Sequence, residues 1–382
     1  MAVNELKDSR NPPISQIGAI LWLRTNLFSN WTNTILTIVS LLLIYVSVPP
    51  MLDWALISAN FNFGTVSIFG FDIEFSEEMA TNSNCGRSAA CWPFIYEKFD
   101  MFIYGFYPRE ELWRPNIVFG LTASLFLIVR VLRGSKYKNK VLAALIVLFP
   151  IVSFFLISGG IGTLETVETH KWGGLMLTLL IAAVGIIVSF PIGVILALGR
   201  QSELSAIRSF SIIYIEFIRA VPLITILFMA SNILPLFFES GTSFDKLLRA
   251  LIAITLFQAA YMAEVVRGGL QAIPKGQYEA ADAIGLSYFQ KNILIILPQA
   301  LKISIPNIVG SSISLFKDTT LVLIIGLMDF LQMVTTASAD KYWLGRYTEG
   351  YIFVALVMWI MLYTMSRYSK KLELRFNTEN KN

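Results

Sequence analysis

The sequence predicts an all-α protein that crosses a membrane many times. The chain of 382 residues is 55% hydrophobic and only 15% charged, with a mean hydropathy of +0.64, whereas a soluble chain carries roughly 25% charged residues. Several apolar runs reach the length of about 20 residues that a membrane-spanning helix needs. We expect about eight spans, at residues 32–50, 115–132, 141–159, 172–198, 211–238, 247–266, 302–328 and 350–367.

Lysine and arginine are distributed unevenly over the loops that join these spans. If the N-terminus lies in the cytoplasm, most of them fall on the cytoplasmic side, including the basic residues that follow the second span and those of the C-terminal tail. Cytoplasmic loops of membrane proteins carry such an excess of positive charge. We therefore expect both termini, and the polar segment 267–301, in the cytoplasm.

The chain is predicted to have two parts and a tail. Residues 1–170 hold three spans and an aromatic-rich outer loop at about 51–114, which is interpreted either as an interfacial cap or as a docking surface for a partner. Residues 171–370 hold five spans and the polar insert 274–298. Residues 371–382 form a cytoplasmic tail.

Both cysteines, Cys85 and Cys91, fall in the outer loop. In an oxidising compartment they can close a small disulfide ring, which would restrict the unfolded chain. Two free thiols are the alternative, and the sequence does not decide between them.

The insert 274–298 has the local signals of a helix–glycine–helix elbow. Pro274 suits the start of a helix, where its missing N–H would be unpaired. Gly285 suits the left-handed residue that ends a helix. Ser287 with Gln290 forms a capping box for a second helix, which Pro298 is expected to end or kink.

The first helix of this elbow is predicted to carry a docking face. Ala280, Ala283 and Ile284 share one side of the helix, and small residues there allow it to enter a groove on another protein. Glu279 lies at the edge of that side, where it can make charge-assisted hydrogen bonds. An interfacial helical hairpin without a partner is the alternative.

Charged residues occur inside the seventh span, where they are costly and mark a pathway or an interface. Lys317 and Asp318 are adjacent, so on a helix they point about 100° apart and each needs its own partner. We expect Asp318, with Thr319, Thr320 and Lys317, to form a polar lining of a translocation path. The alternative is that Asp318 bonds to another helix and never contacts a substrate.

A second polar cluster lies in the fifth span. Glu216 and Arg219 are three residues apart and can pair on one helix face. Pro222 is expected to break this elbow helix from the span that follows. We favour a structural or gate-forming role near the cytoplasmic side over direct contact with a substrate.

The sequence offers no residues for enzyme chemistry. It contains no G-x4-GK[ST] phosphate loop, His170 is the only histidine, and two cysteines are too few for a structural zinc site. We expect no catalytic residue, no metal site, no cofactor bound by this chain and no nucleic-acid partner.

Three motifs resemble those of a known family. Residues Glu279 to Pro298 follow the pattern EAA-x3-G-x9-I-x-L-P, which resembles the cytoplasmic docking loop of membrane subunits in ABC importers. The ExxR stretch followed by Pro-Leu at 216–223, and the KDT run that begins at Lys317, resemble elements of polar amino-acid permeases. The three additional spans make the chain similar to the long membrane subunit of the general L-amino-acid permease system of Gram-negative bacteria.

This resemblance implies a multi-subunit importer in the bacterial inner membrane. Its parts would be a periplasmic amino-acid-binding protein, this chain with a related shorter permease subunit, and two copies of an ATPase that binds ATP and Mg²⁺. A secondary transporter driven by an ion gradient, with Asp318 as the proton carrier, is the alternative. In the resemblance the ATPase would couple to the chain through Glu279, Ala280, Ala281, Ala283, Ile284 and Gly285.

Overall fold

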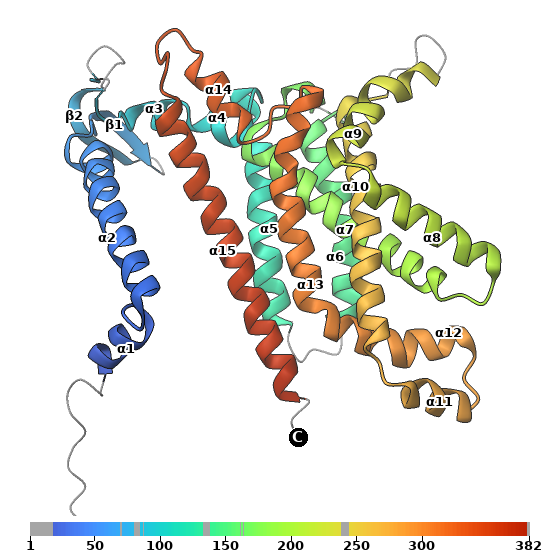
Figure 1. Cartoon of the computed structure of the whole chain (residues 1–382). Coiled ribbons are helices and arrows are strands. Elements are labelled where there is room, and N and C mark those ends of the chain that lie inside the picture. The colour runs from blue at the N-terminus through green and yellow to red at the C-terminus, as the bar shows by residue number, and fades with distance from the viewer. Residues whose placement is uncertain are drawn as a thin grey trace, which may run out of the picture. The chain divides into compact units, whose positions relative to one another are not determined.

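The computed structural model describes residues 18–68, 71–79, 85–86, 88–132, 138–160, 162, 164–237 and 244–379. The basic loop at 133–137 that contributes to the predicted charge asymmetry lies outside them. The chain divides into two compact units, Met1–Pro93 and Phe94–Asn382 (Figure 1).

The first unit consists of helices followed by a short antiparallel sheet. Asn30 caps helix α2 by accepting a hydrogen bond from the Asn33 N–H. A π-helical turn, Asp53–Ile57, continues α2 into a candidate membrane span of 27 residues. The hairpin of β1 and β2, with a register shift between Phe63 and Thr65, is an addition to the helical architecture expected from the sequence. The elements are α1 (Gly18–Asn26), α2 (Trp31–Leu52), β1 (Phe63–Ile68) and β2 (Phe71–Met79).

A disulfide between Cys85 and Cys91 closes the loop that follows this hairpin. Both cysteines are buried. Next to the ring, the Trp92 indole N–H donates to the Ala55 carbonyl oxygen at 2.8 Å, and the Asn60 N–H donates to the Ala90 carbonyl oxygen at 2.8 Å. Of the two alternatives that the sequence leaves open, the structure contains the disulfide, and the ring is anchored to the end of the α2 span.

The second unit is a helical bundle with a helical cap at one end and the elbow at the other (Figure 1). Among the described residues of this unit, four long helices are apolar enough to cross a membrane, and a bent pair provides one more span. The predicted membrane fold with a five-helix core is thereby confirmed. The bundle consists of α5 (Trp113–Val131), α6 (Lys138–Ser158), α7 (Gly174–Arg200), α8 (Ser205–Ala220), α9 (Leu223–Phe228), α10 (Lys246–Gln271), α13 (Leu297–Asp318) and α15 (Tyr347–Glu379). The cap includes α3 (Pro93–Glu97), α4 (Phe99–Tyr104) and α14 (Gln332–Ser338). The elbow contains α11 (Lys275–Ala283) and α12 (Tyr288–Lys291).

Small residues bring α7 into close contact with α10. Ser189 is buried, and a Cβ added to Gly193 would lie 2.7 Å from the Cβ of Met262 on α10. Small side chains let helix backbones approach closely, and in a membrane this packing drives association. Gly185, Ser189, Gly193 and Ala197 recur every four residues along α7 and are all buried. These small residues therefore pack within the subunit, and α7 with α10 forms the centre of the bundle.

The boundary between the two units differs from the predicted division at residues 170 and 171. Ile157 and Val167 belong to the same buried apolar cluster as Met176 and Leu177 of α7. The Tyr107 hydroxyl, also in this cluster, donates to the Ile157 carbonyl oxygen at 2.8 Å. The second half of the predicted extension, from Phe94 onward, therefore packs on the five-helix core as one unit with it.

The predicted span 211–238 is broken rather than continuous. Helix α8 and the helical segment that begins with α9 meet at an angle of 99°. Val221 is extended, with φ −100° and ψ 131°, because a residue before proline is excluded from the helical region. The break at Pro222 was predicted, but the size of the bend turns α8 away from the direction of the spans.

Mass spectrometry can test the disulfide of the first unit. Arg87 lies between the two cysteines, so trypsin should release two peptides that only the Cys85–Cys91 bond holds together. We expect the linked pair without reductant and two separate alkylated peptides after reduction. Alkylation of both cysteines before reduction would contradict the structure.

Candidate functional site

The elbow has the helix–glycine–helix geometry that its sequence predicts. Helix α11 ends at Ala283, and Gly285, two residues further on, has a left-handed φ of +75°. The Gly285 N–H donates to the Asp282 carbonyl and the Leu286 N–H to the Ala281 carbonyl, the two bonds of a Schellman motif. Ser287 and Gln290 then form the predicted capping box at the start of α12. Backbone hydrogen bonding thus fixes the turn on both sides of Gly285.

Side-chain contacts hold α11 against the helix that follows it. The Lys291 ammonium lies 2.6 Å from the Asp282 carboxylate, and the Gln299 amide donates to Gln277 at 3.0 Å. Ala281 is only 1% exposed. Its place in the predicted docking set is therefore corrected, because its side chain is enclosed by the chain's own packing and cannot reach a partner.

The other residues predicted to dock remain accessible. Glu279, Ala280, Ala283 and Gly285 are exposed, and Ile284 is 70% exposed. Figure 1 shows α11 and α12 projecting from one end of the bundle. We call the four of these that have side chains, Glu279, Ala280, Ala283 and Ile284, the elbow face.

The elbow is continuous with the span that follows. A single helical run extends over 38 residues from Tyr288 to Ile325. It includes a π-helical turn, Asn292–Ile296, in which the Leu297 N–H donates to the Asn292 carbonyl five residues back. Pro298 does not end this run but occupies the first turn of α13. Figure 1 shows the run changing direction between α12 and α13, as expected where a π-turn and a proline meet.

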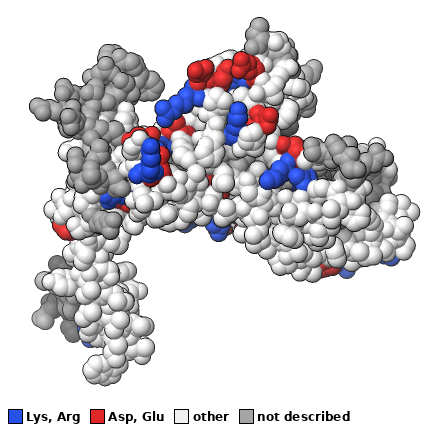
Figure 2. All heavy atoms as spheres, turned by 90° about the horizontal axis from the view of Figure 1, so that it is seen from above, with Lys and Arg blue, Asp and Glu red and all other residues white. Residues whose placement is uncertain are grey.

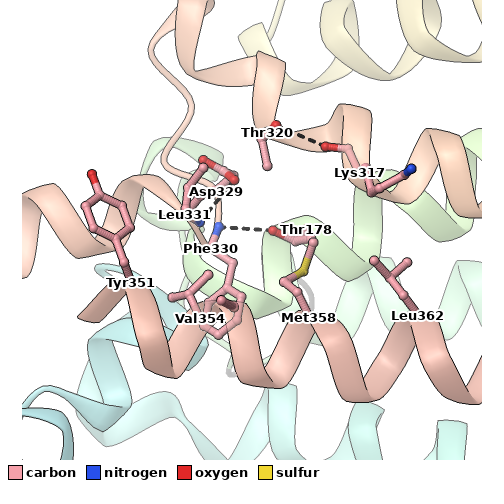
Figure 3. Close-up of a pocket in the computed structure, with 11 residues that line it drawn as sticks. Thr178, Lys317, Thr320, Asp329, Phe330, Leu331, Tyr351, Val354, Met358 and Leu362 are labelled. Carbon is pink, nitrogen blue, oxygen red and sulfur yellow. Dashed lines mark hydrogen bonds between the residues drawn. The ribbon is translucent and has the colours of Figure 1, made fainter. Parts of the chain in front are cut away.

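The far end of this run lies at a pocket of about 440 Å³ (Figure 3). The walls come from α7, from the end of α13, from the loop before α14 and from α15. Lysine, threonine and aspartate side chains form the polar part of its lining, and α15 forms most of the apolar part. The lining residues are Thr178, Lys317, Thr320, Asp329, Phe330, Leu331, Tyr351, Val354, Ala355, Met358 and Leu362.

Only part of the predicted polar lining reaches this pocket. Lys317 and Thr320 line it, whereas Asp318 and Thr319 do not. The Thr319 side chain is buried and donates to the Phe316 carbonyl. Successive helical residues point about 100° apart, so the rotation that brings Lys317 to the pocket turns Asp318 away. Asp318 and Thr319 therefore lie outside this pocket, and their place in the lining of a translocation path stays a prediction.

Asp329 is a pocket residue that sequence reasoning missed. It is 1% exposed, and its carboxylate accepts hydrogen bonds from the Leu331 and Gln332 N–H groups at 3.1 Å each. Burial raises the pKa of this carboxyl from 3.8 to about 6, against the lowering effect of these bonds. An aspartate three residues before the start of α14, in the position of a helix cap, is the sequence signal that could have found it.

A cluster of charged side chains joins α7, α8 and α10. Glu264 of α10 contacts three guanidinium groups, those of Arg200 at 3.6 Å, Arg219 at 3.7 Å and Arg267. Glu216 accepts a hydrogen bond from Arg200 at 2.8 Å. The predicted pairing of Glu216 with Arg219 is thus corrected, because neighbouring helices supply each residue with a closer partner. The arrangement ties the bent helix α8 to the centre of the bundle.

Comparisons with known proteins identify the family. The family described as "Binding-protein-dependent transport system inner membrane component" matches residues 189–377. The inner membrane amino-acid ABC transporter permease protein YhdY of Escherichia coli (strain K12) is 49% identical over 362 residues, which cover 94% of both chains. This chain belongs to the family of ABC transporter permeases. The predicted family is thereby confirmed.

Two further relatives differ in how much of this permease they match: one matches nearly the whole chain and the other about half of it. The glutamate/glutamine/aspartate/asparagine transport system permease protein BztC of Rhodobacter capsulatus is 38% identical and covers 99% of this chain and 98% of its own. The probable glutamine ABC transporter permease protein GlnP of Bacillus subtilis is 35% identical over 53% of this chain and 92% of its own. The ion-gradient alternative has no support in these relatives.

The pH dependence of stability should report the buried state of Asp329. Because its folded pKa of about 6 exceeds the ordinary 3.8, the folded protein holds this proton more tightly. The resulting stabilisation is complete below about pH 4 and lost as the pH rises through 6, and a shift of about two units corresponds to roughly 3 kcal/mol. Asp329→Asn should remove this pH dependence in thermal unfolding of the purified permease.

Asp340→Asn is the matched control. A hydrogen bond from Lys98 lowers the pKa of the Asp340 carboxyl, so its contribution has the opposite sign and is lost as the pH falls. Asp329→Asn should change the slope of stability against pH between about pH 4 and 6, whereas Asp340→Asn should change it in the opposite direction and only at lower pH, as the pH falls below about 4. An unchanged slope in Asp329→Asn would contradict the buried carboxyl.

Proposed function

We propose that this permease is the long membrane subunit of an ATP-driven amino-acid importer, with both termini in the cytoplasm of the bacterial inner membrane. The observation that carries the proposal is the single helical run that joins the elbow to the pocket. The names of the two relatives that match nearly the whole chain, an amino-acid permease and a permease for glutamate, glutamine, aspartate and asparagine, support the substrate class.

The elbow face is the part that we assign to coupling with a separate ATPase, which would bind ATP and Mg²⁺. An exposed apolar side chain, Ile284, stands beside small residues and the Glu279 carboxylate, as in a helix that enters a groove. The Asp282–Lys291 ion pair and the buried Ala281 hold α11 to the following helix. Movement of the face would therefore move the helical run with it.

The assembly that we propose contains a second, shorter permease subunit and an amino-acid-binding protein in the periplasm. The match to a relative over 53% of this chain but 92% of its own length supports a partner without the extension. Differential binding by these partners and by the ATPase would bias the two states of the transporter, since a conformational equilibrium shifts only through unequal affinities. The charged cluster around Glu264, with Pro222 at the bend, would hold α8 near a gate.

The pocket has the chemistry to bind an amino acid. Lys317 makes no ion pair with another described residue within 4.0 Å, so its ammonium can attract the carboxylate. Asp329 and the hydroxyls of Thr178 and Thr320 supply acceptors for the amino group. Val354, Met358 and Leu362 form an apolar wall for the side chain. In this proposal Lys317, rather than Asp318, is the charged residue of the path.

The coupling role is tested with the complete transporter in proteoliposomes. Glu279→Lys should abolish ATP-driven amino-acid uptake, because it reverses the charge at the edge of the elbow face, while the permease still inserts into the membrane. Glu203→Lys is the matched control, since Glu203 is exposed on the loop between α7 and α8, and it should leave uptake unchanged. Uptake that survives Glu279→Lys would remove the docking assignment.

The substrate role of the pocket is tested by removing the charge of Lys317 and, in a separate variant, that of the adjacent Asp318. Lys317→Met should raise KM for uptake roughly ten- to hundredfold, since a hydrogen bond to a charged group contributes about 1.5–3 kcal/mol. Asp318→Asn should change KM much less, because Asp318 does not line the pocket. The reverse order of effects would place the substrate elsewhere.

A further inference from the structure

Three glycines form a close backbone junction between the cap and the bundle. Gly105 follows α4 with a φ of +71°, and a Cβ there would collide with the backbone of Gly173. A Cβ on Gly174 would in turn collide with the Phe102 carbonyl oxygen. The Phe106 N–H donates to the Lys171 carbonyl at 3.1 Å. The end of α4 is thus fixed to the start of α7 with no space for a side chain between them.

The same junction contacts the wall of the pocket. The Gly174 N–H donates to the Met328 carbonyl at 2.9 Å, and Gly174 forms a β-bridge with Asp329. One helical turn on, the Thr178 hydroxyl accepts a hydrogen bond from the Phe330 N–H at 3.0 Å, as Figure 3 shows. The backbone of α7 therefore connects Gly105 directly to the loop that places Asp329.

Side chains of residues 94–112, which we call the cap segment, reach the pocket wall by a second route. Phe102 is fully buried, and its ring centroid lies 5.4 Å from that of Phe353 on α15. Phe353 also contacts Phe330 of the pocket wall, at 6.0 Å between centroids. Lys98 pairs with Asp340 beyond the end of α14 at 2.8 Å. The cap segment thus supports the pocket wall from α7, α14 and α15.

The surface above these contacts is polar. Figure 2, which views the molecule from the cap end, shows acidic and basic side chains gathered on this face. The pair of Arg109 and Asp100, with 3.9 Å between its closest atoms, belongs to this exposed surface. The cap segment therefore has a charged outer side and an apolar inner side that packs on the pocket wall.

We propose that the cap segment is a positioning element of the pocket, and that Gly105 is its positioning residue. By holding the start of α7, Gly105 sets where Asp329 and Phe330 lie, and thereby how tightly this subunit binds an amino acid. The proposal rests on the amino-acid site of the proposed function. It assigns to the part of the extension from Phe94 onward a role in substrate affinity.

Gly105→Ala tests the proposal, with Gly120→Ala as the matched control. Gly120 lies on α5, where an added Cβ meets nothing within 4 Å. In complete transporters, Gly105→Ala should raise KM for amino-acid uptake roughly tenfold, because a displacement of about 1 Å in a binding site has effects of this order or larger. The rate at saturating substrate should change far less, and Gly120→Ala should alter neither constant.

A reporter independent of transport separates this proposal from the proposed function. Met358→Cys places a thiol on the pocket wall, and its alkylation rate by a small maleimide should change severalfold when Gly105→Ala is added but not when Gly120→Ala is added. If Gly105→Ala changes the alkylation rate but the transporter without this substitution takes up no amino acid, amino-acid import is contradicted and the positioning role of Gly105 still stands. An unchanged rate together with an unchanged KM would overturn the positioning role.

Phe102→Leu provides the milder variant if Gly105→Ala does not assemble. It removes the aromatic contact with Phe353 without a backbone collision. A shifted KM and a shifted alkylation rate in Phe102→Leu support the proposal. Wild-type values of both in a stably folded Phe102→Leu protein would refute it.

Discussion

The continuity of the helical run Tyr288–Ile325, which includes Pro298 and Pro306, is the constraint on which the rest of the structure depends. In a membrane every backbone polar group needs an internal partner, so a broken helix at Pro298 would be costly. The π-turn at Asn292–Ile296 keeps the run helical up to the proline. One end therefore carries the elbow, and Lys317 near the other end lines the pocket. A displacement of the elbow would therefore be passed along this helical run to Lys317 at the pocket.

Movement of the helical run can change the pocket only if other helices stay in place. We call these stationary helices the frame. Helices α7 and α10 supply it through close packing at Gly193 and Met262 and through the charged cluster around Glu264. The cap segment extends this frame to the far end of the bundle. The pocket lies between the frame and the helical run. In the proposed coupling the run moves relative to the frame, and this movement would change the shape of the pocket.

Local signals explain why the elbow was predictable and the pocket was not. Pro274, Gly285 and the Ser287–Gln290 box act over a few residues, so sequence spacing alone indicated the turn. Which of Lys317 and Asp318 faces a cavity depends on the rotation of the helix against its neighbours. The partners of Glu216 and Arg219 come from α7 and α10, and Asp329 is buried only because distant segments meet around it. Tertiary packing decided these features, as it decided the position of the unit boundary.

Coupling of the elbow to the pocket requires that the helical run moves as one rigid body. Spin labels at Phe289 and Ile303, both exposed, would bracket the π-turn, and a third label at Ile195 would mark the frame. Pulsed electron spin resonance of the complete transporter should give the same 289–303 distance with and without bound ATP, while the 289–195 distance changes. A change of several ångströms between 289 and 303 would make the π-turn a hinge and contradict rigid transmission.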